Sequence, residues 1–373
     1  MPTEKAHGIQ LAKMCEAFTA AGIEVELVVP ARKTVAESVA HFYDLRTPIR
    51  LTRLPVIDWY ERNRFGFFVG SLSFMISYFF YLWYTRMRGD LKVMYTTDID
   101  QFSFLLIPFL GVPYFVEIHD AKKKSILFSI LFKYARGIIV INRIIKKKIS
   151  EVFHISQEKI IVHPNGVDIE KFNTLVSREE AREKLSLPQK IPIALYVGRI
   201  YQWKGMDILL DTAAECKEIF FYIVGGTSDE LVAVSGESRH LSNIVCAGSR
   251  KYEEIPLWLA AADVLLVLGT KENKYSYFHT SPMKLLEYMA SHQPIVASDT
   301  PANREIVSES EVFFYESDNS ESLAYAIKHV LHANHPELQF RIDHANKKIR
   351  TLTWEKRAED IIHFIEKSLA YRK

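Results

Sequence analysis

The sequence predicts an α/β protein with parallel sheets, divided into two domains. Residues 193–197 are an apolar, β-rich run, and residues 206–210 carry the spacing of a helix after a short loop. A second buried-type strand covers residues 294–299 and follows a short helix that begins near Ser281. Strands that alternate with helices in this way are typical of Rossmann-like units. The chain has 373 residues, 48% of them hydrophobic, which is enough for two cores.

The N-terminal half predicts a similar unit that lacks its first strand. A loop leads directly into a helix over residues 9–20 and then a strand over residues 23–29, so no strand precedes the helix. Loss of a buried central strand would leave two rows of backbone hydrogen-bonding groups unpaired. We therefore expect an apolar, β-rich run of about six residues upstream in the reading frame. A genuine start at Met1 in a soluble, active protein would refute this.

A charge-free segment of about 20 residues, 65–84, is long enough to span a bilayer. It stands between two predicted strands of one sheet, residues 50–55 and 92–95, and a span would place these strands on opposite sides of the membrane. Arginines flank both ends, so the flanking charge gives no orientation: Arg62, Arg64, Arg86 and Arg88. We predict a helix packed on the sheet, with partial insertion at a membrane surface as the alternative.

The net charge of +2 is unevenly distributed. Residues 1–150 hold 21 Lys and Arg against 13 Asp and Glu, with the densest clusters at residues 122–124 and 146–148. This basic half favours an anionic partner, although both clusters are equally consistent with solvated helix faces. A membrane surface fits better than nucleic acid, because no nucleic-acid-binding pattern accompanies the charge. Three widely spaced cysteines and the lack of a secretory signal favour an intracellular protein.

Two cations follow the strand over residues 193–197. Arg199 and Lys204 stand in the loop at its carboxyl end, which is the ligand edge of an open α/β sheet. A guanidinium and an ammonium there can neutralise a pyrophosphate. Two cations in an isolated loop are more often simply solvated, so this hypothesis depends on a second stretch of sequence.

That second stretch begins at Ser281 and Pro282, which are typical of the N-cap and the first position of a helix. The backbone N–H groups of the following turn, which holds Met283 and Lys284, would point toward an anion. Glu287 comes about one and a half turns later, where a carboxylate can accept two hydrogen bonds from a ribose diol. Together the two stretches predict a site for one nucleotide diphosphate.

Six segments form an ordered set across most of the chain: residues 163–168, 198–205, 224–226, 281–299, 304–307 and 353–355. In this order they resemble the retaining glycosyltransferases of family 4. The resemblance implies the GT-B fold, with two facing Rossmann-like domains and the active site in the cleft between them. It implies an acceptor-side domain over residues 1–170 and a donor-binding domain over residues 173–350. A helix over residues 354–371 would return to pack on the first domain.

The resemblance also implies the activity, which is retaining transfer from a UDP- or GDP-linked sugar to a glycan or a lipid-linked acceptor. No metal and no cofactor besides the donor is expected, and the protein would be cytoplasmic or peripheral at the inner membrane face. The residues implied in catalysis are His119, Arg199 and Lys204. Those implied in donor binding are Gly8, Gly198, Arg199, Lys204, Gly248, Ser249, His279, Ser281, Met283, Lys284 and Glu287.

One position departs from the family pattern, which usually has two glutamates eight positions apart. The position eight before Glu287 is His279. Either His279 donates to a sugar hydroxyl or Glu272 swings in from the preceding loop, and both alternatives stay open. The segment Asp98-Ile99-Asp100 matches the D-x-D of other glycosyltransferases, but three residues match cheaply and we assign no metal there.

Two rival functions remain. A nucleotide-sugar epimerase of similar fold would need carboxylates for proton chemistry at a sugar carbon, and no such pair is evident. A non-catalytic partner subunit is the other rival, because of His279 and the missing strand.

Overall fold

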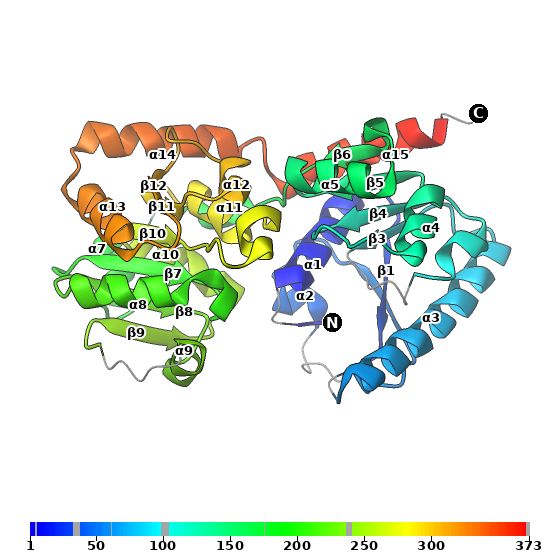
Figure 1. The fold of residues 1–373 in the computed structure, drawn as a ribbon, viewed down its shortest axis with the longest axis horizontal. Helices are drawn as coiled ribbons and strands as arrows, with labels where there is room; N and C mark the ends of the chain where they lie inside the picture. Colours follow the sequence, from blue (N-terminus) through cyan, green and yellow to red (C-terminus); the bar gives the residue numbers. More distant parts are fainter. Residues whose placement is uncertain are drawn as a thin grey trace. The chain divides into compact units, whose positions relative to one another are not determined.

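The computed structural model describes residues 1–3, 6–32, 38–60, 62–97, 104–174, 176–235 and 241–370. The chain forms two compact units (Figure 1). Unit 1 contains residues 1–164 and 354–373, and unit 2 contains residues 165–353. The C-terminal helix α15 (Trp354–Ala370) is therefore part of unit 1, where it packs on the first helix, α1 (Ala6–Ala20).

The strands of unit 1 are parallel but fall into two sheets. The strands are β1 (Glu26–Pro30), β2 (Arg50–Leu54), β3 (Met94–Thr97), β4 (Tyr114–Ile118), β5 (Gly137–Val140) and β6 (Ile160–Val162). One sheet pairs β1 with β2, and the other has the order β3-β4-β5-β6. The described residues hold no strand before α1. The two sheets part between β1 and β3, where such a strand would pair in a doubly wound domain.

One face of the β3–β6 sheet is covered by helices that share a core with it. The remaining helices of unit 1 are α2 (Val39–Phe42), α3 (Arg64–Met87), η1 (Ile107–Leu110), α4 (Ile126–Tyr134), α5 (Arg143–Phe153) and η2 (Gln157–Lys159). The predicted helix over residues 65–84 is α3, which buries a stripe at four-residue spacing: Gly66, Gly70, Phe74 and Tyr78. By length and composition α3 could cross a membrane, but a third of its most apolar stretch is buried against the unit.

Unit 2 has one continuous parallel sheet of six strands in the order β12-β11-β10-β7-β8-β9. The strands are β7 (Ile193–Val197), β8 (Phe220–Val224), β9 (Ile244–Gly248), β10 (Val264–Val267), β11 (Ile295–Ser298) and β12 (Phe313–Tyr315). The two strands predicted from the sequence, at residues 193–197 and 294–299, are confirmed as β7 and β11. The chain order reverses next to β7, so the carboxyl end of β7 is the switch point at which such sheets bind ligands.

Helices cover both faces of this sheet, and each face has its own core. They are α6 (Ile169–Phe172), α7 (Arg178–Lys184), η3 (Gln202–Lys204), α8 (Met206–Glu215), α9 (Ser228–Ser235), η4 (Tyr252–Glu254), α10 (Ile255–Ala261), the π-helix η5 (Tyr275–His279), α11 (Met283–Ala290), α12 (Pro301–Arg304), α13 (Ser320–His332) and α14 (His335–Ile349). The fold class predicted from the sequence, two α/β Rossmann-like domains, is confirmed.

One predicted helix start is wrong. Helix α11 begins at Met283 with Pro282 at the N-cap, and the Ser281 side chain does not cap it. The Ser281 hydroxyl instead accepts a hydrogen bond from the Asn165 backbone N–H, at 3.2 Å. A tertiary contact has therefore replaced the local cap.

Candidate functional site

Glycines bring the carboxyl ends of β7, β8 and β9 close together. Gly198 follows β7 with φ +136°, and Gly225 follows β8 with φ +117°, which are dihedrals that side-chain-bearing residues rarely adopt. The Gly198 N–H donates to the Val224 carbonyl at 2.7 Å, and the Gly225 N–H donates to the Gly248 carbonyl at 2.9 Å. A Cβ at Gly225 would lie 2.8 Å from the Gly198 carbonyl carbon. The backbone at this edge therefore leaves no room for side chains of its own.

Lys204 lies beside this edge, at the end of η3. Its ammonium donates to the Arg199 carbonyl at 3.0 Å and lies over the rings of Tyr201 and Trp203. Burial and the nearby Arg199 guanidinium lower the pKa of Lys204 to about 8. Among the described residues, no carboxylate forms an ion pair with Lys204.

Lys284 reaches the same place from the first turn of α11. Its Nζ lies 3.5 Å from the centroid of the Tyr196 ring, and a Cβ at Gly198 would lie 2.9 Å from that Nζ. Burial and the Lys204 charge lower the pKa of Lys284 well below its usual value, against an opposing effect of Glu287. The structure thus brings Gly198, Lys204 and Lys284 together at the switch point of the sheet.

Glu287 is buried one turn after Lys284 and accepts a hydrogen bond from the Tyr252 hydroxyl at 2.9 Å. Desolvation raises the pKa of Glu287 to about 7, although Tyr252 and Lys284 both favour its ionised form. Tyr252 follows Gly248 and the exposed Ser249, so the loop after β9 is joined to α11 through this bond.

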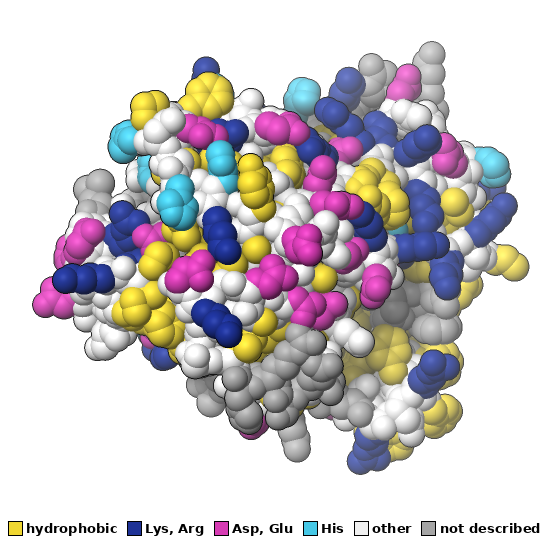
Figure 2. Space-filling view, turned by 60° about the vertical axis from the view of Figure 1, so that its left-hand side comes forward, with side chains coloured by type: hydrophobic (Ala, Val, Ile, Leu, Met, Phe, Trp, Pro, Cys, Tyr) yellow, Lys and Arg dark blue, Asp and Glu magenta, His cyan; other side chains and the backbone are white. Residues whose placement is uncertain are grey.

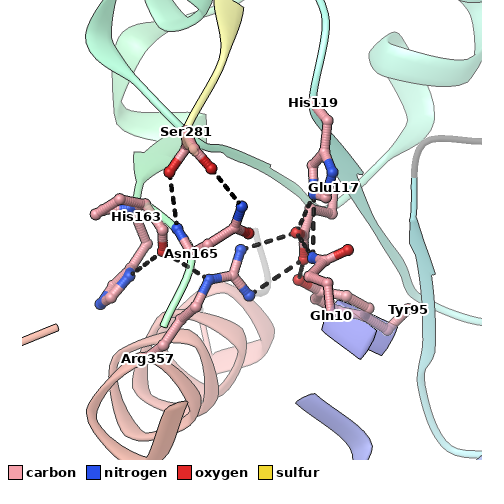
Figure 3. A network of polar contacts seen from close by, with 9 residues as sticks. Gln10, Tyr95, Glu117, His119, His163, Asn165, Ser281 and Arg357 are labelled. Carbon is pink, nitrogen blue, oxygen red and sulfur yellow. Dashed lines mark hydrogen bonds and ion pairs between the residues drawn. The ribbon is translucent and has the colours of Figure 1, made fainter. Parts of the chain in front are cut away.

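The segment before α11 is held by Asn165 (Figure 3). The Asn165 side-chain amide donates to the Ser281 carbonyl at 2.9 Å, in addition to the backbone bond to the Ser281 hydroxyl. Two residues earlier, His279 is buried at the end of η5, whereas Glu272 is exposed. Both alternatives for the second sugar-facing group stay predictions.

Unit 1 has a buried ion pair of its own at the carboxyl end of β4 (Figure 3). Both Glu117 and Arg357 are fully buried, and an Arg357 Nη atom donates to Glu117 Oε1 at 2.8 Å. Desolvation would raise the pKa of Glu117, but Arg357 and then His119 outweigh it and hold this pKa far below its usual value. Arg357 also donates to the Pro164 carbonyl at 2.9 Å, which fixes α15 to the end of β6 and the segment after it.

His119 stands just after β4 and is oriented by the same carboxylate. Its Nε2 contacts both Glu117 Oε1 and the Gln10 side-chain amide, the latter at 3.1 Å, and Tyr95 donates to the other Glu117 oxygen. The predicted catalytic histidine is thus held on one side by a charged group and an amide.

Two further positions from the sequence analysis are Gly8 and the D-x-D segment. The resemblance implied donor binding by Gly8, but the space where its Cβ would lie is filled by the Tyr43 hydroxyl and by Thr3. Gly8 therefore makes room for Tyr43, which hydrogen-bonds to the Thr3 backbone. The D-x-D segment, residues 98–100, lies outside the described residues.

Sequence reasoning missed three residues that hold predicted site residues in place: Glu117 and Arg357 around His119 in unit 1, and Tyr252 on Glu287 in unit 2. Glu117 had a usable signal, because a single charge in an apolar strand needs a buried partner. That partner, Arg357, is more than 200 positions away in the chain, and no local pattern links the two. Tyr252 likewise gave no signal of its contact with Glu287.

Two family descriptions match this chain. Residues 8–171 match Glycosyltransferase Family 4, and residues 191–333 match Glycosyl transferases group 1. Each match covers most of one of the two predicted domains.

Curated relatives match a part of the chain. D-inositol 3-phosphate glycosyltransferase 1 of Catenulispora acidiphila is 30% identical over 152 residues, which are 37% of this chain and 34% of that protein. The D-inositol 3-phosphate glycosyltransferase of Mycolicibacterium smegmatis is 32% identical over 145 residues, 37% of this chain and 31% of that protein. The match thus spans about a third of the length of these relatives.

Solved structures match almost the whole chain. Sucrose-phosphate synthase from Thermosynechococcus elongatus has a TM-score of 0.74 at 19% identity, with 99% of this chain and 94% of that chain covered. HepE of Anabaena, solved in complex with UDP and glucose, has a TM-score of 0.72 at 15% identity, with 98% and 97% covered. At these identities the likeness concerns the fold.

Proposed function

We propose that this chain, which belongs to the group 1 glycosyltransferases of family 4 and has the GT-B fold, transfers a sugar from a nucleotide diphosphate sugar to an acceptor hydroxyl. One observation carries this proposal. Lys204 and Lys284 meet beside Gly198, and neither has an ion-pair partner among the residues that the structure describes. A diphosphate supplies the negative charge that would stabilise both ammonium groups.

The proposed chemistry depends mainly on positive charge that stabilises the leaving diphosphate. The acceptor oxygen bonds to the anomeric carbon as the bond from that carbon to the phosphate oxygen breaks. The acceptor proton goes to a phosphate oxygen of the leaving diphosphate. Arg199, Lys204 and the first amides of α11 stabilise the negative charge that grows on this group. We propose that the sugar keeps its anomeric configuration and that no divalent metal is required, because fixed cations supply the charge.

Glu287 and His119 have the other proposed roles. Glu287 accepts hydrogen bonds from the ribose hydroxyls, and its Oε1 is oriented by Tyr252. His119, held by Glu117 and Gln10, contacts the sugar or steadies the positive charge on it in the transition state. The HepE complexes with UDP and glucose support a UDP-linked donor. The D-inositol 3-phosphate relatives support an acceptor with free hydroxyls, which we extend to glycans and lipid-linked sugars.

Replacement of the site cations tests the function. We expect Arg199→Ala and Lys204→Ala each to lower turnover about 100-fold or more, since each removes charge that acts on the leaving group. Lys328→Ala, an exposed lysine of α13 in unit 2, is the matched control and should leave turnover unchanged. A thermal-shift screen of UDP- and GDP-sugars identifies the donor, and NMR of the product reports the anomeric configuration. Near-normal turnover in both site variants would contradict the proposal, and a loss of turnover with EDTA would contradict metal independence.

The buried His279 favours one rival, a non-catalytic partner subunit, because it stands where the family usually has a glutamate. The thermal-shift screen, followed by an assay for transfer, distinguishes the partner subunit from an active glycosyltransferase. Donor binding with no transfer to any acceptor and no donor hydrolysis would support the partner subunit.

A further inference from the structure

Unit 1 exposes a large apolar surface on three neighbouring elements. Twelve of the twenty exposed large hydrophobic side chains among the described residues lie on α3, η1 and α4. Helices α3 and α4 both contact η1, so the three elements form one continuous surface, which we name the α3–α4 face. Its exposed hydrophobic residues are Phe65, Phe67, Phe68, Ile76, Phe80, Trp83, Tyr84, Met87, Phe109, Ile126, Ile130 and Tyr134.

The exposed side chains of α3 form a stripe opposite its buried one. Phe65, Ile76, Phe80, Trp83 and Met87 follow one another at separations that fit whole turns of a helix, so they point the same way. Phe80 is 62% and Trp83 49% exposed, and Phe109 on η1 is 72% exposed. A helix with one apolar face in the core and a second apolar face in solvent needs a further apolar environment.

The charge on this face is predominantly positive. Residues 62–89 and 121–136 contain nine Lys and Arg and no Asp or Glu. Asp90, just past α3, pairs with one of them, Arg88. On α4 a groove of about 380 Å³ has Ile126 and Ile130 in its wall and Lys124 and Lys133 beside them. Figure 2 shows Lys and Arg side chains gathered toward the right of the view, next to hydrophobic ones, and acidic side chains more frequent elsewhere.

We propose that the α3–α4 face binds the surface of an anionic lipid bilayer. Its aromatic side chains enter the headgroup region and its Lys and Arg contact lipid phosphates. A second copy of the chain fits this face less well, because two such surfaces would bring like charges together. Helix α3 lies on the bilayer and does not cross it, because Phe74 and Tyr78 of its inner stripe are packed into the core of unit 1. This proposal is independent of the proposed sugar transfer.

Co-flotation of the full chain with vesicles tests the proposal. We expect binding to vesicles of phosphatidylcholine mixed with phosphatidylglycerol, weaker binding at high salt, and about tenfold weaker binding to phosphatidylcholine alone. The double variant Phe80→Ser, Trp83→Ser should weaken binding to the mixed vesicles about tenfold or more. The double variant Lys123→Glu, Lys124→Glu should weaken binding to the mixed vesicles only. Intrinsic Trp fluorescence of the unaltered chain should shift to shorter wavelength on binding.

The matched control is Tyr325→Ser with Phe340→Ser, two exposed aromatic residues of unit 2, which should leave vesicle binding unchanged. Thermal unfolding of all variants separates lost binding from lost folding. Absence of binding to either vesicle, or equal loss in the control, would overturn the proposal. So would a dimer in sedimentation that the Phe80, Trp83 variant abolishes, because the face would then be a protein interface.

Discussion

Arg357 of unit 1 and the two site lysines of unit 2 are held in opposite ways, although unit 2 also has a buried cation with a partner, Arg182 on Asp263. In unit 1, Arg357 is fully buried against Glu117, and the pair ties α15 to β4. In unit 2, Lys204 and Lys284 are largely buried without an ion pair among the described residues, and both have lowered pKa values. A buried charge with its partner inside the fold contributes to structure, whereas a buried charge without one is stabilised when a ligand brings the partner. The difference assigns Arg357 to the scaffold and the two lysines to the binding site.

The β-sheets of the two units also differ, because one is continuous and the other is divided. Unit 2 has six strands in one sheet, and β7, at its centre, is buried along its whole length. In unit 1 the sheet is divided between β1 and β3, and four of the five residues of β1 are only partly buried. The unit with the continuous sheet thus holds, at the carboxyl end of β7, the two lysines that have no ion pair with any described residue. The other unit depends on contacts such as the Glu117–Arg357 pair between distant elements.

The largest expected effect comes from breaking the buried pair. Arg357→Met should lower the free energy of unfolding by about 3–5 kcal/mol, because it leaves the Glu117 carboxylate buried without its cation. Denaturant unfolding measures this. Lys184→Met is the control, since Lys184 pairs with Glu180 on the exposed face of α7 and should contribute about 0–1 kcal/mol. A loss below about 1 kcal/mol for Arg357→Met would mean that the pair does not hold unit 1 together.

The second effect is a pH dependence of ligand binding in unit 2. Because the pKa of Lys204 in the free protein is about 8, its ammonium is lost as pH rises above that value, and a bound diphosphate favours the protonated form. UDP affinity should therefore fall above pH 8, by up to about tenfold per pH unit. Lys204→Arg should bind UDP without this fall, since arginine stays charged. Calorimetry at several pH values tests this, and an unchanged profile in the arginine variant would exclude Lys204 as the titrating group.

The smallest effect has the opposite sign to the first. Lys284→Met removes a partly buried cation that has no ion pair in the described structure, so it should raise the free energy of unfolding of the ligand-free protein by about 1 kcal/mol. The same variant should lose the thermal stabilisation by UDP. Denaturant unfolding without UDP measures the stability of the variant, and thermal unfolding with and without UDP measures its stabilisation by the ligand. A destabilised Lys284→Met would remove the contrast between the units, because Lys284 would then serve the scaffold as Arg357 does.

Local patterns predicted much of the fold. Apolar runs of strand length identified β7 and β11, and the charge-free segment identified α3 as a helix packed on the sheet. The strand expected upstream of the first helix stays a prediction, and among the described residues the sheet of unit 1 is divided between β1 and β3. The predicted start of α11 was wrong, because the Ser281 hydroxyl accepts a hydrogen bond from the Asn165 N–H and does not cap its own helix.

By itself, the sequence determined the α/β class, the elements around β7 and α11, and the presence of cations after β7, because these depend on hydrophobic period and on neighbours along the chain. Only the tertiary structure decided which charges have partners. Tyr252 and Glu287 are 35 positions apart, and Glu117 and Arg357 are 240 positions apart. Lys284 likewise meets Gly198 from a distant part of the chain. Whether a buried charge serves stability or binding depends on such contacts, because the free energy of a charge is set by what surrounds it in space.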